Sequence, residues 1–205
     1  METKVYILHC ARLVERKQHM VQQMNSAQIF NFEWIEKFDK DEITDEQASK
    51  FKPNYKRSIM SLHLKWNYVF DLIASSDANP YALVLEDDVI LRDGFTTDFA
   101  AYMKQLPADF DMLFLGDGCR LHYPHTVPEK NVYLYPSTRC TDSIVISKKC
   151  AEILSQYISQ PDLIIDNAID HWLNPVIKKL GLKVFWAEPT IVTQGSQNGL
   201  FGQSH

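Results

Sequence analysis

The stretch that decides the fold is Tyr81-Ala82-Leu83-Val84-Leu85-Glu86-Asp87-Asp88-Val89. It opens with a continuous apolar run, of the length of a buried strand, which stops abruptly at three consecutive carboxylates. Carboxylates at the end of a buried strand repel one another and are costly to desolvate, so strand propensity does not explain them. The stretch therefore predicts a strand that carries a functional site at its carboxyl end.

Apolar patterns on both sides of this stretch alternate between strand and helix. The expected strands are residues 5–10, 30–38, 81–85, 110–115, 143–146 and 184–186. The expected helices are residues 12–24, 58–75, about 96–106, a helix capped by Ser147, and residues 162–173 and 175–180. This alternation predicts an α/β layered fold with a mostly parallel central sheet flanked by helices, as one domain over residues 1–205.

The composition excludes several classes of protein. The chain has 205 residues, of which 45% are hydrophobic and 23% charged, which is typical of a folded globular protein. Its net charge of −5 argues against nucleic acid as a partner. Apolar runs are far shorter than a membrane span and no signal-peptide core is evident, so we expect a cytoplasmic protein without a transmembrane segment. The four cysteines lack CxxC spacing, which indicates neither a zinc knuckle nor a redox pair.

Three features fall at the ends of expected strands, where α/β sheets bind ligands: His9-Cys10, Glu86-Asp87-Asp88 and Gly116-Asp117-Gly118. A divalent cation would relieve the repulsion in the acidic triplet, and oxygen ligands suit Mg²⁺ or Mn²⁺. Strand alternation places Glu86 and Asp88 on one face and Asp87 on the other. The alternative is a solvated acidic turn in which Asp88 caps the following segment.

The residues from Tyr81 to Val89 resemble the acidic motif of glycosyltransferase family 25, which includes lipooligosaccharide and collagen galactosyltransferases. Further blocks similar to that family follow in the same order over nearly the whole chain: Val5 to Arg16, Ser61-Leu62-His63, Leu106 to Gly116, Ser143 to Leu154, Ile164-Ile165-Asp166, and Pro189 with Gln194-Gly195. Each block is weak alone, but their order is specific. Two blocks depart from the family pattern, because His9-Cys10 replaces an Asn-Leu pair and Leu62 separates Ser61 from His63.

The resemblance implies a GT-A (Rossmann-like) fold, a nucleotide-sugar donor and inversion at the anomeric carbon. We therefore expect a hexosyltransferase that moves galactose or glucose from a UDP-sugar to a hydroxyl of a glycan or glycoprotein acceptor. Mn²⁺ or Mg²⁺ would bridge Asp88, with Glu86 or Asp87 beside it, to the diphosphate. His205 is a further candidate ligand, because some GT-A enzymes bring a C-terminal histidine to the metal. The donor sugar, the acceptor and the oligomeric state stay open.

An inverting transfer needs a base for the acceptor hydroxyl. The candidates are Asp166, which matches the late acidic position of the family, then Asp170, one helical turn later, and Asp117 after a strand end. The alternative for Asp166 is a charge that complements the helix dipole.

Donor-binding candidates are Glu86 and Asp87 of the triplet together with His9, Arg12, Arg16 and His63. Arginine pairs well with phosphate, although both arginines also fit a solvated helix face. His63 lies on an apolar helix face, where a packed histidine is the ordinary alternative.

Two other protein classes carry acidic residues at strand ends. Response-regulator receivers carry their acidic pair on the first strand, and aspartate-nucleophile phosphatases carry Asp-x-Asp near the start of the chain; this sequence has neither. A degenerate transferase domain that binds a nucleotide, a glycan or a protein stays open as the alternative to an enzyme.

Overall fold

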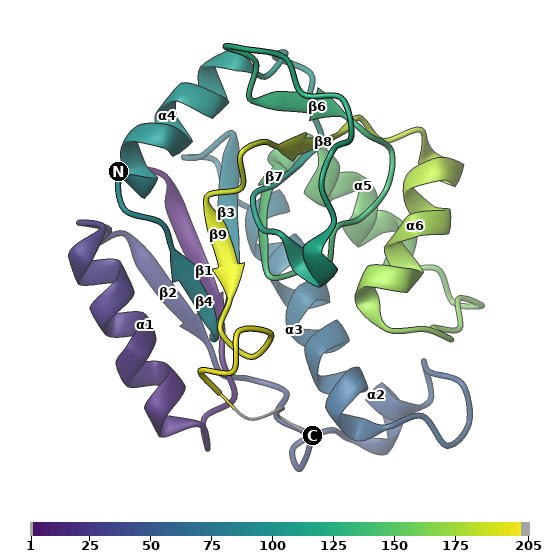
Figure 1. Cartoon of the computed structure of the whole chain (residues 1–205). Coiled ribbons are helices and arrows are strands. Elements are labelled where there is room, and N and C mark those ends of the chain that lie inside the picture. The colour runs from purple at the N-terminus through teal and green to yellow at the C-terminus, as the bar shows by residue number, and fades with distance from the viewer. Residues whose placement is uncertain (1, 202–205) are drawn as a thin grey trace.

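A computed structural model describes residues 2–201 of the chain. Within them the central sheet has seven strands, in the order β2 (Phe32–Ile35), β1 (Lys4–Leu8), β3 (Tyr81–Glu86), β7 (Ser143–Ser147), β5 (Met112–Phe114), β8 (Val184–Ala187) and β6 (Val132–Leu134) (Figure 1). Strands β2, β1, β3, β5 and β8 run in one direction, while β7 and β6 oppose them. The predicted α/β class with a mostly parallel sheet is confirmed.

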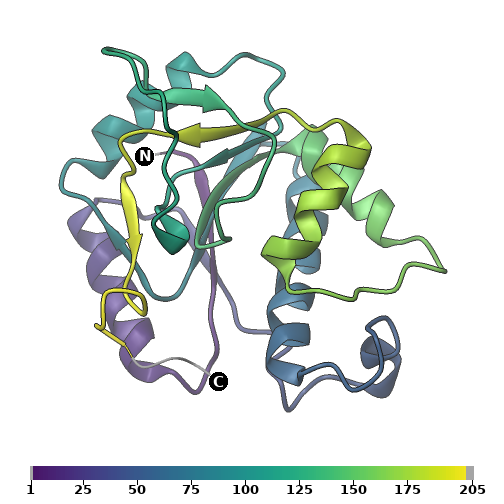
Figure 2. The same ribbon diagram turned by 45° about the vertical axis from the view of Figure 1, so that its right-hand side comes forward.

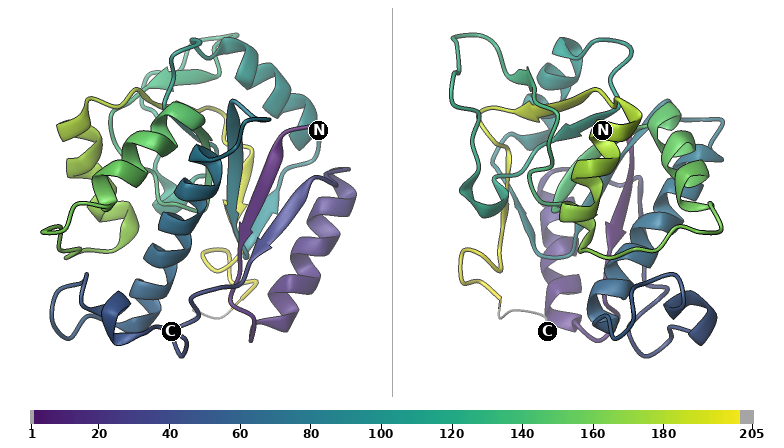
Figure 3. Two further views of the ribbon diagram at one scale, coloured as in Figure 1. Left: turned by 180° about the vertical axis from the view of Figure 1, so that it is seen from behind. Right: turned by 90° about the vertical axis from the view of Figure 1, so that its right-hand side faces the viewer.

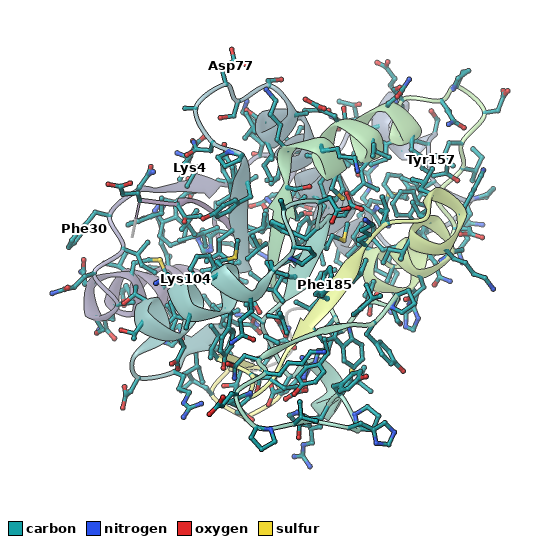
Figure 4. The ribbon with its side chains drawn as sticks, turned by 90° about the horizontal axis from the view of Figure 1, so that it is seen from above. Lys4, Phe30, Asp77, Lys104, Tyr157 and Phe185 are labelled. Carbon is teal, nitrogen blue, oxygen red and sulfur yellow. The ribbon has the colours of Figure 1, made fainter. Side chains whose placement is uncertain are left out.

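Helices cover both faces of the sheet (Figures 2 and 3). One face carries α1 (Val14–Ser26) and α4 (Phe95–Gln105); the other carries α3 (Arg57–Ala74), α5 (Lys148–Ile158) and α6 (Ile169–Leu180). Figure 4, seen from above, shows α4 with Lys104 and α5 with Tyr157 on opposite sides of the sheet. Alternation along β1 explains the two layers, because Tyr6 and Leu8 enter one buried cluster and Val5 and Ile7 the other.

Several elements begin where the sequence predicts. Ser147 ends β7 and caps α5, and its hydroxyl accepts a hydrogen bond of 3.1 Å from the backbone N–H of Cys150. The charged segment before α3 contains one short helix, α2 (Asp45–Ala48), with a capping box between Thr44 and Gln47. No helix within residues 2–201 is long and apolar enough to span a bilayer.

The two helices predicted at residues 162–173 and 175–180 are wrong, because α6 is a single helix that begins at Ile169 and contains Pro175. Proline removes one helical hydrogen bond, which favours a break. Tertiary contacts outweigh it: the Asn174 side chain accepts hydrogen bonds of 2.9 Å from the Ser137 hydroxyl and the Thr138 backbone N–H. Residues before and after the proline are also buried in the core, namely Trp172, Leu173, Val176 and Ile177.

Four short elements were not predicted: β6, the 3₁₀ turn η1 (Gly118–Arg120), and the antiparallel pair β4 (Val89–Leu91) and β9 (Val192–Gln194). The β4–β9 pair brings the late part of the chain back to the acidic triplet. The backbone N–H of Gly195 donates a 2.6 Å hydrogen bond to the carbonyl of Asp88. This return fixes the backbone at the end of the triplet.

The long segment between η1 and β7 is held by one buried arginine. Arg139 has no exposed surface, and its guanidinium donates to the carbonyls of Leu121 (2.6 Å) and Ala187 (2.9 Å) and to the carboxylate of Glu188. It also lies over the ring of Trp186, 4.8 Å from the centroid. Arg139 therefore connects the start of this segment, at Leu121, to the end of β8, at Ala187.

We predict that Arg139→Met lowers the free energy of unfolding by about 3–5 kcal/mol, because it leaves the buried carboxylate of Glu188 without its main partner. Urea denaturation followed by circular dichroism measures the change. Arg92→Met, at an exposed arginine, is the matched control and should stay within about 0.5 kcal/mol of the parent. A loss below about 1 kcal/mol for Arg139→Met would show that the pair contributes little.

Candidate functional site

A cavity of about 370 Å³ opens at the carboxyl ends of β1 and β3. Its walls come from the ends of these strands, the first half of α3, the start of α6 and the residues just before β7. Of the residues proposed from the sequence it contains His9, Arg12, Arg16, Glu86, Asp87 and Asp170. The position is the one that the fold class predicts for a ligand site.

Asp87 is occupied by protein partners. One carboxylate oxygen, Oδ1, accepts a 2.8 Å hydrogen bond from Arg16, and Oδ2 lies 2.8 Å from His9 Nδ1 and 3.3 Å from the backbone N of Cys10. Burial alone would raise the pKa of Asp87, but the hydrogen bonds from His9 and Arg16 outweigh it and the pKa is lowered. Asp87 therefore stays charged, and it anchors the end of β1 and the start of α1 to the end of β3.

The same contacts orient His9. Its ring is almost fully buried, lies edge-on to Trp34 and lines the cavity. Because Nδ1 faces the carboxylate of Asp87, the other nitrogen, Nε2, is left to interact elsewhere. Among the described residues, Nε2 is buried without a hydrogen-bond partner. His9 is thus a fixed polar group at the cavity wall.

Asp88 differs from Asp87 in having a free oxygen. It is 2% exposed, and within residues 2–201 its Oδ1 atom has no hydrogen-bond partner. Its other oxygen lies 3.7 Å from Arg16. A buried carboxylate oxygen without a partner is costly unless a cation or a donor group supplies one. Asp88 is therefore the member of the triplet that best fits a metal ion.

Glu86 is half-buried at the cavity wall. Its oxygens accept hydrogen bonds from the Thr141 hydroxyl at 2.8 Å and from the side-chain amide of Gln194 at 3.5 Å. Burial, and then the nearby charge of Asp88, raise the pKa of Glu86 to about 8. Without a cation this carboxyl is mostly protonated at neutral pH, and a bound cation would favour its charged form.

A fourth acidic residue, Asp142, lies beside the triplet and was not predicted from the sequence. It is 1% exposed, its Oδ1 accepts a 2.6 Å hydrogen bond from Ser143, and its Oδ2 is unpartnered among the described residues. Burial raises the pKa of Asp142 to about 7 against the Ser143 hydrogen bond, and Asp88 contributes to the rise. Gly116 makes room for it, because a Cβ there would lie 2.1 Å from the Asp142 carboxylate. The available signal was position, since the first residues of an antiparallel strand meet the carboxyl ends of its neighbours.

The residues suit a divalent cation only in part. Asp88 and Asp142 each have one buried oxygen without a hydrogen-bond partner in residues 2–201, and Glu86 has a raised pKa that a cation would lower. Across residues 2–201, however, no group of three or more His, Cys, Asp or Glu side chains is arranged to hold a metal ion. His205, the other proposed ligand, lies outside the described residues. Further ligands would therefore have to come from a bound substrate or from other groups.

The three candidate bases occupy different surroundings. Asp170 lies in the first turn of α6, lines the cavity, and accepts a 2.8 Å hydrogen bond from the backbone N–H of His171. Asp166 is exposed, precedes the helix and is not part of the cavity wall, so it shares no helical face with Asp170. Asp117 follows β5 at the N-cap of η1, close enough to affect the pKa of Asp142. Asp170 alone of the three faces the cavity.

Arg12 and Arg16 both line the cavity but differ in exposure. Arg12 is exposed, whereas Arg16 is 7% exposed and its guanidinium is bound by Asp87 and packs 5.3 Å from the centroid of the Phe201 ring. The predicted solvated helix face therefore describes neither residue, because Arg12 is exposed but precedes α1, and Arg16 lies in α1 but is buried.

His63 lies in the aromatic core, outside the cavity wall. It is fully buried edge-on between Phe51 and Trp172, and its Nε2 lies 3.1 Å from the carbonyl of Asn167. Burial lowers the pKa of His63 from 6.5 to about 4, although the hydrogen bond to Asn167 opposes this. The surroundings of His63 are therefore those of the packed histidine that was the alternative, and His63 is not part of the cavity wall.

This burial predicts acid destabilisation. Because the folded-state pKa lies below the unfolded value, the unfolded chain binds the proton more tightly, and stability falls as pH drops from about 6.5 towards 4. We expect His63 to contribute about 3 kcal/mol of this loss between pH 7 and pH 4. Urea denaturation at both pH values should show a smaller loss in His63→Gln than in the parent. The exposed-residue control His125→Gln should match the parent, and equal pH dependence in all three proteins would contradict the assignment.

Three solved structures resemble the chain distantly. The first is a glycosyltransferase involved in glycosylation of the major capsid of PBCV-1, with 11% identity and a TM-score of 0.43 over 91% of this chain and 94% of that chain. The other two are an active-site mutant of LgtC (11% identity, TM-score 0.44) and galactosyltransferase LgtC with donor and acceptor sugar analogs (9% identity, TM-score 0.42), each over 94% of this chain and 86% of that chain. These scores are too low to bear on mechanism. No curated protein matches the chain. The family model described as glycosyltransferase family 25 (LPS biosynthesis protein) matches residues 2–160. That match spans most of the chain, which therefore belongs to glycosyltransferase family 25.

Proposed function

We propose that this chain is an inverting, metal-dependent hexosyltransferase. It transfers galactose or glucose from a UDP-sugar to a hydroxyl of a glycan or glycoprotein acceptor. Family membership supports glycosyl transfer, and one observation supports the metal-dependent form: the buried Asp88 Oδ1 atom, unpartnered among the described residues, at the end of β3. A carboxylate kept free in such a place is expected to meet a cation when the donor binds.

The donor would bind in the cavity at the ends of β1 and β3. Arg12 is exposed at the cavity wall and would bind the diphosphate. Arg16 also lies at the wall, where its guanidinium is held by Asp87. The Nε2 atom of His9 offers a fixed hydrogen-bonding group to the nucleotide. Asp87 would act by holding Arg16 and His9 in place, because both of its carboxylate oxygens already bind these side chains.

Mn²⁺ or Mg²⁺ would be held by Asp88 with Glu86, and Asp142 supplies a further carboxylate beside them. When bound, the ion would neutralise charge on the departing diphosphate. Burial and the neighbouring negative charges raise the pKa of both Glu86 and Asp142, and a bound cation would favour their charged forms. Proton release on metal binding is the expected consequence.

The acceptor hydroxyl would give its proton to Asp170. This carboxylate faces the cavity from the start of α6, across from the ends of β1 and β3. Its Oδ1 accepts a hydrogen bond from the backbone N–H of His171, and Oδ2, which lies 3.9 Å from His171 Nε2, would accept the proton. Asp166 and Asp117 are the less favoured candidates for this role, because they do not line the cavity.

Donor hydrolysis separates an enzyme from a binding module. The protein should release UDP from UDP-galactose or UDP-glucose when Mn²⁺ is present, and EDTA should abolish the release. UDP that binds tightly without any release from either sugar nucleotide would favour a degenerate binding domain.

A further inference from the structure

Two cysteines far apart in the sequence meet beside the cavity. The Sγ atoms of Cys119, in η1, and Cys140, before β7, are 3.5 Å apart, and both residues are free thiols. Cys119 is exposed, whereas Cys140 is half-buried and lines the cavity. A disulfide has an S–S distance of about 2.05 Å, so the two sulfurs need to approach by about 1.5 Å.

The backbone is shaped to allow this contact. Gly118 leaves the necessary space, because a Cβ at that position would lie 2.4 Å from the Cβ and 2.6 Å from the Sγ of Cys140. Cys119, Arg120 and Cys140 all have positive φ angles, between 55° and 58°, which residues with side chains rarely adopt. Such conformations persist only where the surroundings hold them. The buried Arg139, next to Cys140, supplies part of that support through its hydrogen bond to Leu121, next to η1.

Both cysteines are also linked to Glu86 at the cavity wall. On one side, Thr141, the neighbour of Cys140, donates a hydrogen bond to Glu86. On the other, the backbone N–H of Cys119 donates to Gln197, whose amide donates to Gln194, which in turn contacts Glu86. A covalent bond between the two sulfurs would therefore join η1 to the wall of the proposed donor site.

We propose that Cys119 and Cys140 form a reversible thiol–disulfide site that reacts with hydrogen peroxide. The exposed sulfur of Cys119 loses its proton and attacks one oxygen of hydrogen peroxide. The O–O bond breaks, Cys119 becomes a sulfenic acid, and the displaced hydroxide takes up a proton and leaves as one water. The sulfur of Cys140 then displaces the sulfenic oxygen, which leaves as a second water, and the S–S bond forms. Two thiols and one peroxide thus give one disulfide and two waters. A dithiol reductant reverses the reaction by exchange.

The remaining cysteines provide internal controls. Cys150 is fully buried, and Cys10 lines the cavity next to Asp39, with its thiol 3.6 Å from the carboxylate. In the described part of the chain, neither has another thiol within hydrogen-bond distance. The site is therefore expected to be selective for one pair among the four cysteines of the chain.

The test treats the reduced full-length protein with a small excess of hydrogen peroxide and counts free thiols. Non-reducing peptide mapping by mass spectrometry then identifies the linked residues. We expect the loss of two of the four thiols, one Cys119–Cys140 linked peptide, and recovery of all four thiols with dithiothreitol. Cys150→Ser should form the same link, whereas Cys119→Ser should form none, and circular dichroism should show that both variants are folded.

A disulfide that involves Cys10 or Cys150, or oxidation of Cys119 to a sulfinic acid without a disulfide, would overturn the proposal. So would a loss of free thiols that dithiothreitol does not reverse, or four intact thiols after treatment. Because the readout is a covalent bond, the outcome does not depend on whether the chain transfers a sugar.

Discussion

Asp88→Asn is expected to lower sugar transfer by at least about 10³-fold while the protein stays folded. The substitution keeps the size of the side chain but removes the negative charge that would hold the metal ion against the diphosphate. A Lewis-acid metal contributes several kcal/mol to such a step, and each 1.36 kcal/mol corresponds to a factor of ten in rate. The rate of UDP release from the preferred UDP-sugar at saturating Mn²⁺ measures the effect.

Asp93→Asn is the matched control, because Asp93 is an exposed aspartate only five positions away. It should transfer sugar at the rate of the parent protein. If Asp88→Asn keeps more than a tenth of the parent rate, the free oxygen of Asp88 has another purpose and the metal site lies elsewhere.

Asp170→Asn should lower turnover by about 10²–10⁴-fold and leave UDP binding within about twofold of the parent. The amide cannot accept a proton, so the acceptor hydroxyl loses its base, whereas the groups proposed to bind the donor are untouched. Steady-state kinetics with an acceptor, combined with calorimetric titration of UDP, distinguish the two effects.

Asp166→Asn is the paired variant for this experiment. Asp166 matches the family pattern in sequence, but it is exposed and outside the cavity wall, so its replacement should leave turnover close to that of the parent. The opposite result, in which Asp166→Asn is inactive and Asp170→Asn is active, would assign the base to Asp166.

The order of strands and helices was predictable because each buried strand and each helix face has its own apolar period. Tyr81 to Leu85 and the face of α3 with Trp66 and Phe70 are examples. Short elements were not predictable. The strands β4 and β9 have three residues each and depend on pairing across the chain, which leaves no local pattern. Pro175 did not end the helix because Ser137 and Thr138, which lie outside α6, hydrogen-bond to Asn174 within it.

The site was predictable where it depends on sequence alone. The acidic triplet could be found in the sequence. Which of its carboxylates stay without a partner could not, because this depends on the side chains that the fold brings to each one. Both oxygens of Asp87 are occupied by His9 and Arg16, residues 78 and 71 positions earlier, whereas Oδ1 of Asp88 has no hydrogen-bond partner among residues 2–201. Asp142 could not be predicted because it directly precedes β7, a strand that runs antiparallel to its neighbours. The contact between Cys119 and Cys140 also depends on tertiary structure, since their spacing matches no known motif.

The most direct test of the central claim is calorimetric titration of UDP into the protein with Mn²⁺ and, separately, with EDTA. The proposal predicts saturable UDP binding with Mn²⁺ that weakens at least about tenfold in EDTA, and the same weakening in Asp88→Asn even when Mn²⁺ is present. UDP binding of equal affinity in all three titrations, or no UDP binding by a folded protein with Mn²⁺, would contradict a metal-dependent UDP-sugar site at the end of β3.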